Sequence, residues 1–159
     1  MRNIFSVDVE DYFHPSEVQR SIPSSQWDER PRRVAHATAA VLEMLARHKV
    51  RATFFILGWV AEKEPGLVKE IASAGHEIGC HSFWHRLIYG LTPEEFAADT
   101  TRAADAIESA CGVRPRIYRA PSYSITERST WALDVLVRQG FTHDSSIYPI
   151  RHDRYGIPG

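Results

Sequence analysis

The sequence is short of cysteine, of net charge and of long hydrophobic runs, and each shortage excludes a class of protein. Its 159 residues include only two cysteines, too few for a disulfide framework, so we expect Cys80 and Cys111 to be small core residues. The net charge of −1 gives no indication of a nucleic-acid partner. The sequence has neither a membrane-spanning apolar run nor a signal-peptide pattern, so we expect a cytoplasmic protein without a membrane segment.

The hydrophobic pattern predicts strands and helices in alternation along a single domain. Short apolar segments rich in β-branched and aromatic residues predict strands, and amphipathic segments between them predict helices. The expected strands cover 3–9, 51–57, a segment ending at Cys80, 116–119 and 141–144, and the expected helices 34–48, 65–74, 93–111 and 126–139. The segments 12–33 and 145–159 are expected to be irregular. Five such alternations are typical of parallel strands with crossover helices, in an open α/β sheet or part of a barrel.

Polar side chains follow the predicted strands at the points where these strands end. Asp8 and Glu10 end the first strand, His81 follows the third, Arg119 ends the fourth and Asp144 ends the fifth. Because ligands of α/β folds gather at the carboxyl ends of the strands, this coincidence predicts a functional site.

The histidines and carboxylates among these residues could hold a metal ion. His81 and His85 are four residues apart in a loop or first helical turn after the third strand, and on a helical turn both imidazoles would face the same way. Taken alone they could also be a surface pair without a ligand, but two histidines with one carboxylate are a common catalytic metal set. If the first strand is regular, Glu10 shares a face with Asp8 and is the favoured ligand. A bulge after Asp8 would bring in Asp11 instead.

The remaining polar groups could serve the chemistry around such an ion. Asp8 could take a proton from the attacking water, and Arg119 could keep Asp8 ionised and oriented, or could form a surface salt bridge only. Pro121 sets the direction of the loop, and the N–H groups of Ser122 and Tyr123 could stabilise an oxyanion.

Other histidines and aromatic residues are weaker candidates. His14, beside the carboxylates, could be an extra ligand or a substrate contact; His36 and His48 are expected in solvent, and His76 in a structural role. Aromatic residues that could stack on a sugar ring, or belong to the core or the rim, are Tyr12, Phe13, Trp27, Trp84 and Tyr123.

Four motifs, in order, resemble those of the polysaccharide deacetylase (NodB homology) family. They are SVDVEDYF at 6–13, HSFWH at 81–85, RAPSY at 119–123 and DSSIYP at 144–149, and the subgroup that they resemble most is found at bacterial exopolysaccharide and exosortase (PEP-CTERM) loci. The resemblance implies a deformed (β/α) barrel, here about five β/α units. It also implies a divalent metal, often zinc, and removal of N-acetyl groups from amino sugars.

The resemblance also implies roles for residues that match the motifs. Asp8 resembles the catalytic base, His81 and His85 the metal ligands, and Ser82 the hydroxyl that supports them. Arg119 and Pro121 match the arginine motif, and Asp144 an aspartate that tunes the catalytic acid. Substrate contacts are expected at Tyr12, Trp84, Pro121 and Tyr123. The family's commoner adjacent Asp-Asp pair is here Asp8-Val-Glu10-Asp11, which leaves the ligand open between Glu10 and Asp11.

One family feature is missing. The late Leu-x-His motif, whose histidine acts as general acid, has no counterpart, and His152 lies in a different context, so the chain resembles the N-terminal portion of a longer protein. We expect a metal-dependent N-deacetylase of N-acetylated polysaccharides or oligosaccharides. The alternatives are a related hydrolase of small amides or cyclic ureides, and a non-catalytic carbohydrate-binding fragment. The sequence does not indicate an oligomeric state.

Overall fold

The chain folds into a parallel sheet whose strands follow one another in sequence order. The computed structural model describes residues 3–152 and 155–158. The strands are β1 (Ser6–Val9), β2 (Thr53–Ile56), β3 (Glu77–Cys80), β4 (Ile117–Tyr118) and β5 (His143–Asp144). Every neighbouring pair is parallel, in the order β1-β2-β3-β4-β5, which confirms the predicted α/β class with five parallel strands. The strands are shorter than expected, since residues 3–5 and 141–142 lie outside them.

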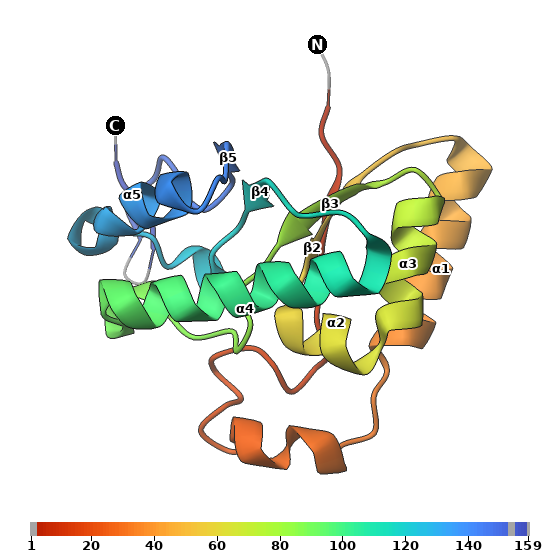
Figure 1. The fold of residues 1–159 in the computed structure, drawn as a ribbon, viewed down its shortest axis with the longest axis horizontal. Coiled ribbons are helices and arrows are strands. Elements are labelled where there is room, and N and C mark those ends of the chain that lie inside the picture. The colour runs from red at the N-terminus through yellow and green to blue at the C-terminus, as the bar shows by residue number, and fades with distance from the viewer. Residues whose placement is uncertain (1–2, 153–154, 159) are drawn as a thin grey trace.

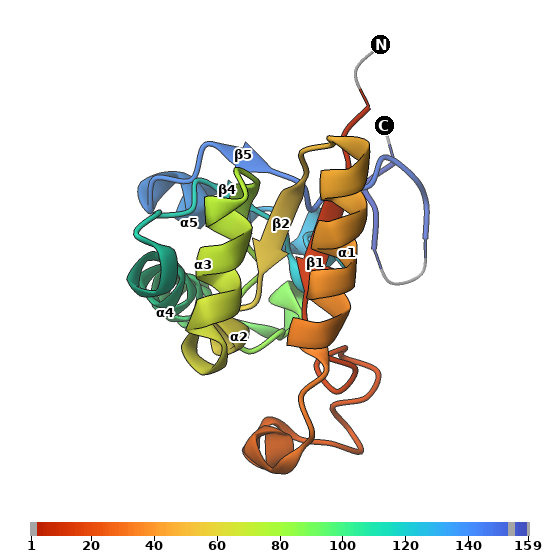
Figure 2. The same ribbon diagram turned by 90° about the vertical axis from the view of Figure 1, so that its right-hand side faces the viewer.

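Helices connect the strands and cover the sheet (Figures 1 and 2). They are α1 (Val34–His48), α2 (Gly58–Lys63), α3 (Pro65–Ser73), α4 (Pro93–Cys111) and α5 (Trp131–Arg138), with short 3-10 helices at Ser24–Glu29, Ile88–Gly90, Pro121–Tyr123 and Glu127–Ser129. The long α4 packs against α2, α3 and α5. Sequence reasoning missed α2. The helix expected from residue 126 divides into a 3-10 turn and α5.

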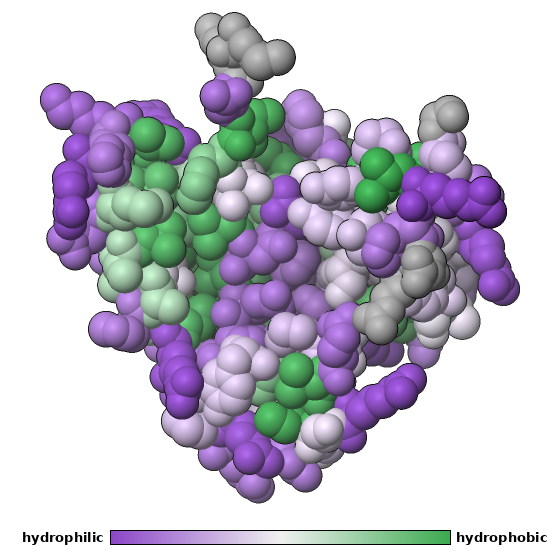
Figure 3. Space-filling view, turned by 180° about the vertical axis from the view of Figure 1, so that it is seen from behind, coloured by the Kyte–Doolittle hydropathy of each residue, from purple (hydrophilic) through white to green (hydrophobic). Residues whose placement is uncertain are grey.

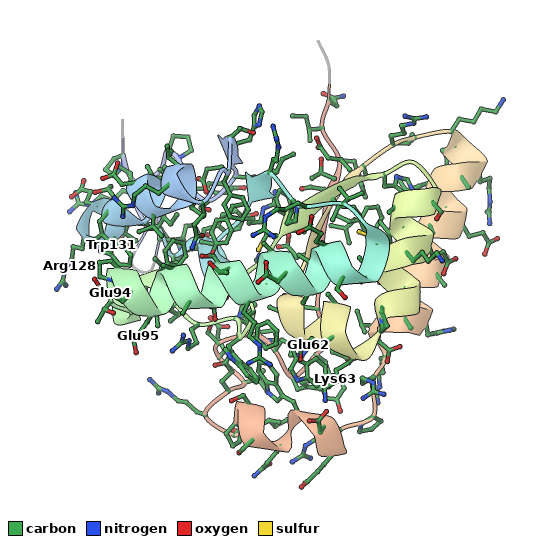
Figure 4. The ribbon with its side chains drawn as sticks, viewed as in Figure 1. Glu62, Lys63, Glu94, Glu95, Arg128 and Trp131 are labelled. Atoms are coloured by element: carbon green, nitrogen blue, oxygen red, sulfur yellow. The ribbon has the colours of Figure 1, made fainter. Side chains whose placement is uncertain are left out.

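Helix α4 begins and ends as its sequence predicts. The Thr92 hydroxyl accepts the Glu95 N–H at 3.2 Å, and the Glu95 carboxylate accepts the Thr92 N–H at 2.8 Å (Figure 4 labels Glu94 and Glu95). This capping box satisfies two N–H groups that the first turn leaves free. Gly112 ends the helix with φ 74°, a conformation that favours glycine. The helix is therefore fixed at both ends, and its inner face has a defined position over the sheet.

Two glycines permit the close packing on which the site depends. A Cβ on Gly79 would lie 2.6 Å from the Phe55 ring, so this ring can lie over β3 only because position 79 has no side chain. A Cβ on Gly58 would lie 2.6 Å from the Phe83 ring and 2.8 Å from the backbone of Ala103. Gly58 thus lets α2 and α4 close on the loop that follows β3.

The sheet is strongly curved. In a flat sheet β4 and β1 would be three strand spacings apart, about 14 Å. Yet Arg119, directly after β4, donates from Nη2 to Ser6 Oγ in β1 at 3.0 Å and to Ser145 Oγ just after β5 at 2.9 Å. One guanidinium reaches both outer strands only because the sheet curls, as it does in part of a barrel.

The surface and the cysteines complete the fold. Within the described residues, no helix has the length and apolar character needed to cross a membrane. Seen from behind, apolar surface is exposed near the N-terminal end of the chain (Figure 3), and exposed apolar side chains include Ile4, Phe5, Met44 and Val50. Cys80 is fully buried, as expected, and burial raises the pKa of its thiol to about 12; Cys111 is half-buried against the core.

Candidate metal and catalytic site

Three of the predicted site residues meet at the carboxyl ends of β1 and β3. Ligand atoms of Glu10, His81 and His85 all lie within 4.8 Å of one another. Glu10 Oε2 is 3.0 Å from His85 Nε2, and the two imidazole centroids are 5.2 Å apart. Two histidines and a carboxylate leave positions open for water and substrate, which is the arrangement of catalytic rather than structural zinc sites.

The tautomer and the protonation of these side chains suit the binding of a cation. His81 Nδ1 donates to the Arg119 carbonyl at 2.8 Å in the tautomer that leaves Nε2 with its lone pair. Burial lowers the pKa of His81, so this imidazole is neutral near pH 7. Burial raises the pKa of Glu10, but the adjacent His85 and the other imidazoles lower it by more, so Glu10 is ionised.

An atom of Glu10 is left without a hydrogen bond in this cluster. Oε2 is buried and has no hydrogen-bond partner among the described residues, although His85 Nε2 lies 3.0 Å away. A buried carboxylate oxygen without a donor is costly unless a cation lies beside it. The donor set is therefore one that a divalent metal such as Zn²⁺ fits; the assignment of ligands stays a prediction.

The neighbouring carboxylate, Asp11, faces the opposite way. Its Oδ2 accepts the N–H groups of Arg33 at 2.7 Å and Val34 at 3.0 Å, and its Oδ1 accepts the Tyr12 N–H at 3.0 Å. Asp11 therefore caps the start of α1, although it lies 22 residues before Arg33. Of the two candidates left open by the sequence, only Glu10 lies in the cluster.

Asp8 lies beside the cluster and is held by Arg119. Arg119 Nη1 donates to Asp8 Oδ1 at 2.8 Å, while Asp8 Oδ2 is 3.9 Å from His81 Nε2. The guanidinium stacks 4.0 Å above the Phe55 ring, and the Arg119 side chain is only 10% exposed. The Arg119–Asp8 pair is therefore not a surface salt bridge. It leaves one oxygen of Asp8 directed at the candidate metal ligands.

Asp144 supports this arrangement from a distance. Its Oδ1 accepts the Ser146 hydroxyl at 2.6 Å and its Oδ2 the Ser146 N–H at 2.9 Å, and Ser146 Oγ accepts the Ala120 N–H at 2.8 Å. Burial raises the pKa of Asp144, and the bonds to Ser146 act against this shift. The described contacts of Asp144 thus fix the loop after Arg119. The catalytic role expected for Asp144 would be exerted through that loop.

The segment 81–85 is a loop, which is one of the two forms, loop or first helical turn, that the sequence left open. Ser82 has φ 68° and His85 has φ 54°, both in the left-handed region. This conformation, rather than helical spacing, brings the two imidazoles to the same side. The buried carboxylate of Asp99, on α4, accepts the Ser82 hydroxyl at 2.6 Å and the Phe83 N–H at 2.7 Å. Sequence reasoning missed Asp99. The available signal was an acidic residue on the apolar face that Phe96, Ala103 and Ile107 define.

The segment after β1 holds the same loop from the other side, which sequence reasoning also missed. Gln19 Nε2 donates to the carbonyls of His14 at 2.8 Å and His85 at 3.1 Å. Ser16 Oγ lies 3.4 Å from His85 Nδ1. Both residues belong to the irregular segment 12–33, where no pattern in the sequence pointed to them.

His14 is not brought into the metal cluster. Its Nδ1 accepts the Asp11 N–H at 2.7 Å, and its ring packs against Phe13, Trp27 and Trp59 with centroid distances of 4.4, 4.5 and 5.0 Å. Burial lowers the pKa of His14 to about 3, so it is neutral and has a structural role. The other histidines lie as expected: His36 and His48 are exposed, and His76 Nδ1 accepts the Ala52 N–H at 3.2 Å.

Of the four predicted substrate contacts, Trp84 and Tyr12 pack against other parts of the chain, whereas Pro121 and Tyr123 belong to the turn that follows Arg119. Trp84 packs against Trp27 at 5.8 Å and under Arg102 at 5.2 Å, and Tyr12 lies 5.1 Å below the Arg33 guanidinium. Neither of these contacts is with the metal cluster. Buried Pro121 starts the turn that carries Tyr123, whose ring is 5.6 Å from the Arg119 guanidinium.

Tyr123 lines a groove next to the site. The groove has a volume of about 660 Å³ and is lined by residues of four connecting segments, among them Ser16, Tyr89, Ser122, Tyr123 and Tyr155. The Tyr123 N–H already donates to the Ala120 carbonyl at 3.1 Å, so the Ser122 N–H is the remaining candidate of the two for an oxyanion.

The fold and the site define an α/β protein with a Glu-His-His cluster and an Arg-held aspartate at the carboxyl ends of its strands. The family model "Polysaccharide deacetylase" matches residues 20–142, and the chain belongs to this family. It is 35% identical over 98 residues to a peptidoglycan-N-acetylglucosamine deacetylase of Bacillus cereus, covering 61% of this chain and 36% of that protein. It is 37% identical over 100 residues to a chitooligosaccharide deacetylase of Bradyrhizobium, covering 62% and 43%.

A solved structure of a carbohydrate esterase is also similar to this chain. The family 4 carbohydrate esterase from Streptomyces lividans, in complex with acetate, superimposes with a TM-score of 0.61 at 29% identity, covering 67% of this chain and 54% of that one. The chain thus matches less than half of the length of the two curated relatives and about half of the esterase. The comparison confirms the predicted fold as part of the deacetylase barrel.

Proposed function

We propose that the protein is a metal-dependent hydrolase that removes N-acetyl groups from the amino sugars of a polysaccharide or oligosaccharide. The observation that carries this proposal is the Glu10–His81–His85 cluster with Asp8 beside it, held by Arg119. Membership of the polysaccharide deacetylase family supports the reaction type, and relatives named for peptidoglycan and chitooligosaccharide support the kind of substrate.

The chain's residues divide the work as follows. Glu10, His81 and His85 would hold the divalent cation, most simply Zn²⁺, which when bound supplies Lewis-acid polarisation of the amide carbonyl and activation of water. Asp8 accepts the proton of the water that attacks the carbonyl carbon. Arg119 orients Asp8 through the hydrogen bond from Nη1, and the Ser122 N–H can donate to the developing oxyanion.

The reaction ends with cleavage of the C–N bond to acetate and a free amine. The leaving nitrogen needs a proton, which Asp8 can return after taking it from the attacking water. Acid catalysis of this kind contributes about 10²–10⁴-fold in rate.

The groove beside Tyr123 supports a sugar substrate. Tyrosine rings offer flat faces and hydroxyl groups, and about 660 Å³ is ample for a sugar unit. We further propose a place in exopolysaccharide biosynthesis, which rests on the likeness of the four motifs to the exosortase-associated subgroup.

The proposal is tested by measuring bound metal and released acetate on the same purified protein. N-acetylated chitooligosaccharides and peptidoglycan serve as substrates, and the double variant His81→Ala/His85→Ala is the control. We expect both metal and acetate release in the wild type and neither in the control, whereas Asp8→Asn should keep the metal and lose acetate release. A folded, zinc-supplemented wild type that binds no more metal than the double variant contradicts the proposal. Opening of cyclic ureides without acetate release would assign the site to another C–N hydrolase.

A further inference from the structure

Helix α4 contributes a buried carboxylate to the loop between the two candidate metal histidines. Asp99 lies near the middle of the helix, and its side chain is 1% exposed. Its Oδ2 accepts the Ser82 hydroxyl at 2.6 Å and the Phe83 N–H at 2.7 Å, and its Oδ1 accepts the Trp84 N–H at 3.3 Å. The carboxylate thus binds three consecutive residues between His81 and His85. Arg86, just beyond them, has Nη2 3.7 Å from Oδ1.

The loop needs such a partner because its backbone is held away from the common conformations. Ser82 and His85 both have positive φ, which costs a residue with a side chain about 1–2 kcal/mol. The turn at Ser82 directs the next N–H groups inward, where they form a small anion-binding concavity. Without Asp99, the Phe83 N–H would be buried without its acceptor, at a cost of about 1–3 kcal/mol.

Asp99 is not placed to contact substrate or metal itself. It is outside the Glu10–His81–His85 cluster, and its hydrogen bonds are with residues 82–84. From the opposite side, Gln19 holds the His85 carbonyl at 3.1 Å, so the loop is held between α4 and the segment after β1. These contacts fix both imidazoles before any ion arrives. Such preorganisation lowers the cost of forming a metal site.

We propose that Asp99 is the positioning residue that presets His81 and His85 for metal binding. This inference rests on the proposed function only in that it takes these histidines as ligands. Outer residues that orient metal ligands are typically worth about 10–100-fold in metal affinity. We therefore expect Asp99 to affect metal affinity through the shape of the loop.

The test compares zinc affinity, measured by competition with a chelator, among four proteins. Asp99→Asn keeps the shape but places an amide where one oxygen accepts, so we expect zinc affinity to fall about 10–100-fold. Ser82→Ala removes one of the three donors and should lose less. The control is Asp105→Asn, on the same helix but exposed and paired with Arg114, which should stay within about twofold of the wild type.

Unfolding of the metal-free proteins is measured in parallel, so that affinity is compared only among folded variants. A folded Asp99→Asn with wild-type zinc affinity overturns the inference, as does a folded Ser82→Ala that loses more than Asp99→Asn. If the wild type binds zinc no better than the His81→Ala/His85→Ala protein, the ligand assignment of the proposed function fails as well. A wild type that binds zinc tightly but releases no acetate contradicts the proposed function and leaves the inference on Asp99 standing.

Discussion

Two clusters of a carboxylate with histidine lie next to each other, and adjacent residues of the chain supply their carboxylates. In the first, Glu10 faces His85 and His81 and keeps a buried oxygen without a hydrogen bond. In the second, Asp11 has both oxygens occupied by backbone N–H groups, and His14 accepts a hydrogen bond from the Asp11 N–H.

The difference shows that burial and residue type do not by themselves make a ligand. His14 and His81 are both buried, and burial lowers the pKa of both. His81, however, uses Nδ1 for the Arg119 carbonyl and has Nε2 directed at the carboxylates, whereas His14 is packed among aromatic rings. What separates the metal site from the structural cluster here is that ligand atoms of Glu10, His81 and His85 converge within 4.8 Å, whereas both oxygens of Asp11 are taken by backbone N–H groups.

The largest expected effect comes from exchanging the two carboxylates for amides, one at a time. Glu10→Gln should lower zinc affinity by at least about tenfold, because loss of a charged ligand should cost no less than loss of a residue that only orients one. Asp11→Asn should leave zinc affinity within about threefold. Titration of both variants against a chelator of known affinity measures this, and equal losses in the two would erase the distinction between the clusters.

The next effect is on stability and concerns Asp11 alone. Asp11→Ala removes the cap of α1, so the free energy of unfolding should fall by about 1–2 kcal/mol. Urea denaturation of the metal-free protein measures this change. The matched control is Glu43→Ala, on the exposed face of the same helix and paired with Arg47, which should cost less than about 0.5 kcal/mol. A loss no larger than that of the control would show that Asp11 is not a cap.

The smallest effect is a pH dependence due to His14. Burial lowers its pKa from 6.5 to about 3, so in this range the unfolded chain binds a proton that the folded chain does not. The contribution to stability is therefore fully present well above pH 6.5 and falls as the pH drops towards 3, by about 0.8 kcal/mol at pH 6. His14→Asn, whose side-chain oxygen can replace Nδ1 as acceptor of the Asp11 N–H, should reduce the slope of unfolding free energy against pH. An unchanged slope would mean that His14 does not remain neutral in the fold.

Much of the fold and of the candidate site could be predicted from the sequence, wherever the signal is local. The capping box at Thr92, the alternation of strands and helices, and the place of Asp8, Glu10 and His81 at strand ends all follow from short-range patterns. The preference for Glu10 over Asp11 came from strand alternation, and Glu10 is the one that lies in the cluster.

Other features were missed because tertiary contacts decide them. The segment 81–85 has helical spacing but adopts left-handed turns, which Asp99 and Gln19 stabilise from distant parts of the chain. Trp84, which the sequence left open between sugar stacking and the core or rim, packs against Trp27, and its segment has no periodicity that could decide between these roles. Sequence patterns do not report which helix face or loop will close over a turn.

Arg119 also bears on how the protein folds. Its hydrogen bonds reach Asp8, 111 residues away, Ser6, 113 residues away, and Ser145, 26 residues ahead. Contacts of such separation form late, because long loops must close before these contacts can form. During refolding, helical signal should therefore return before the capacity to bind zinc. The hydrogen bonds of Arg119, the residue that orients Asp8, would thus form only when the sheet has reached its final curvature.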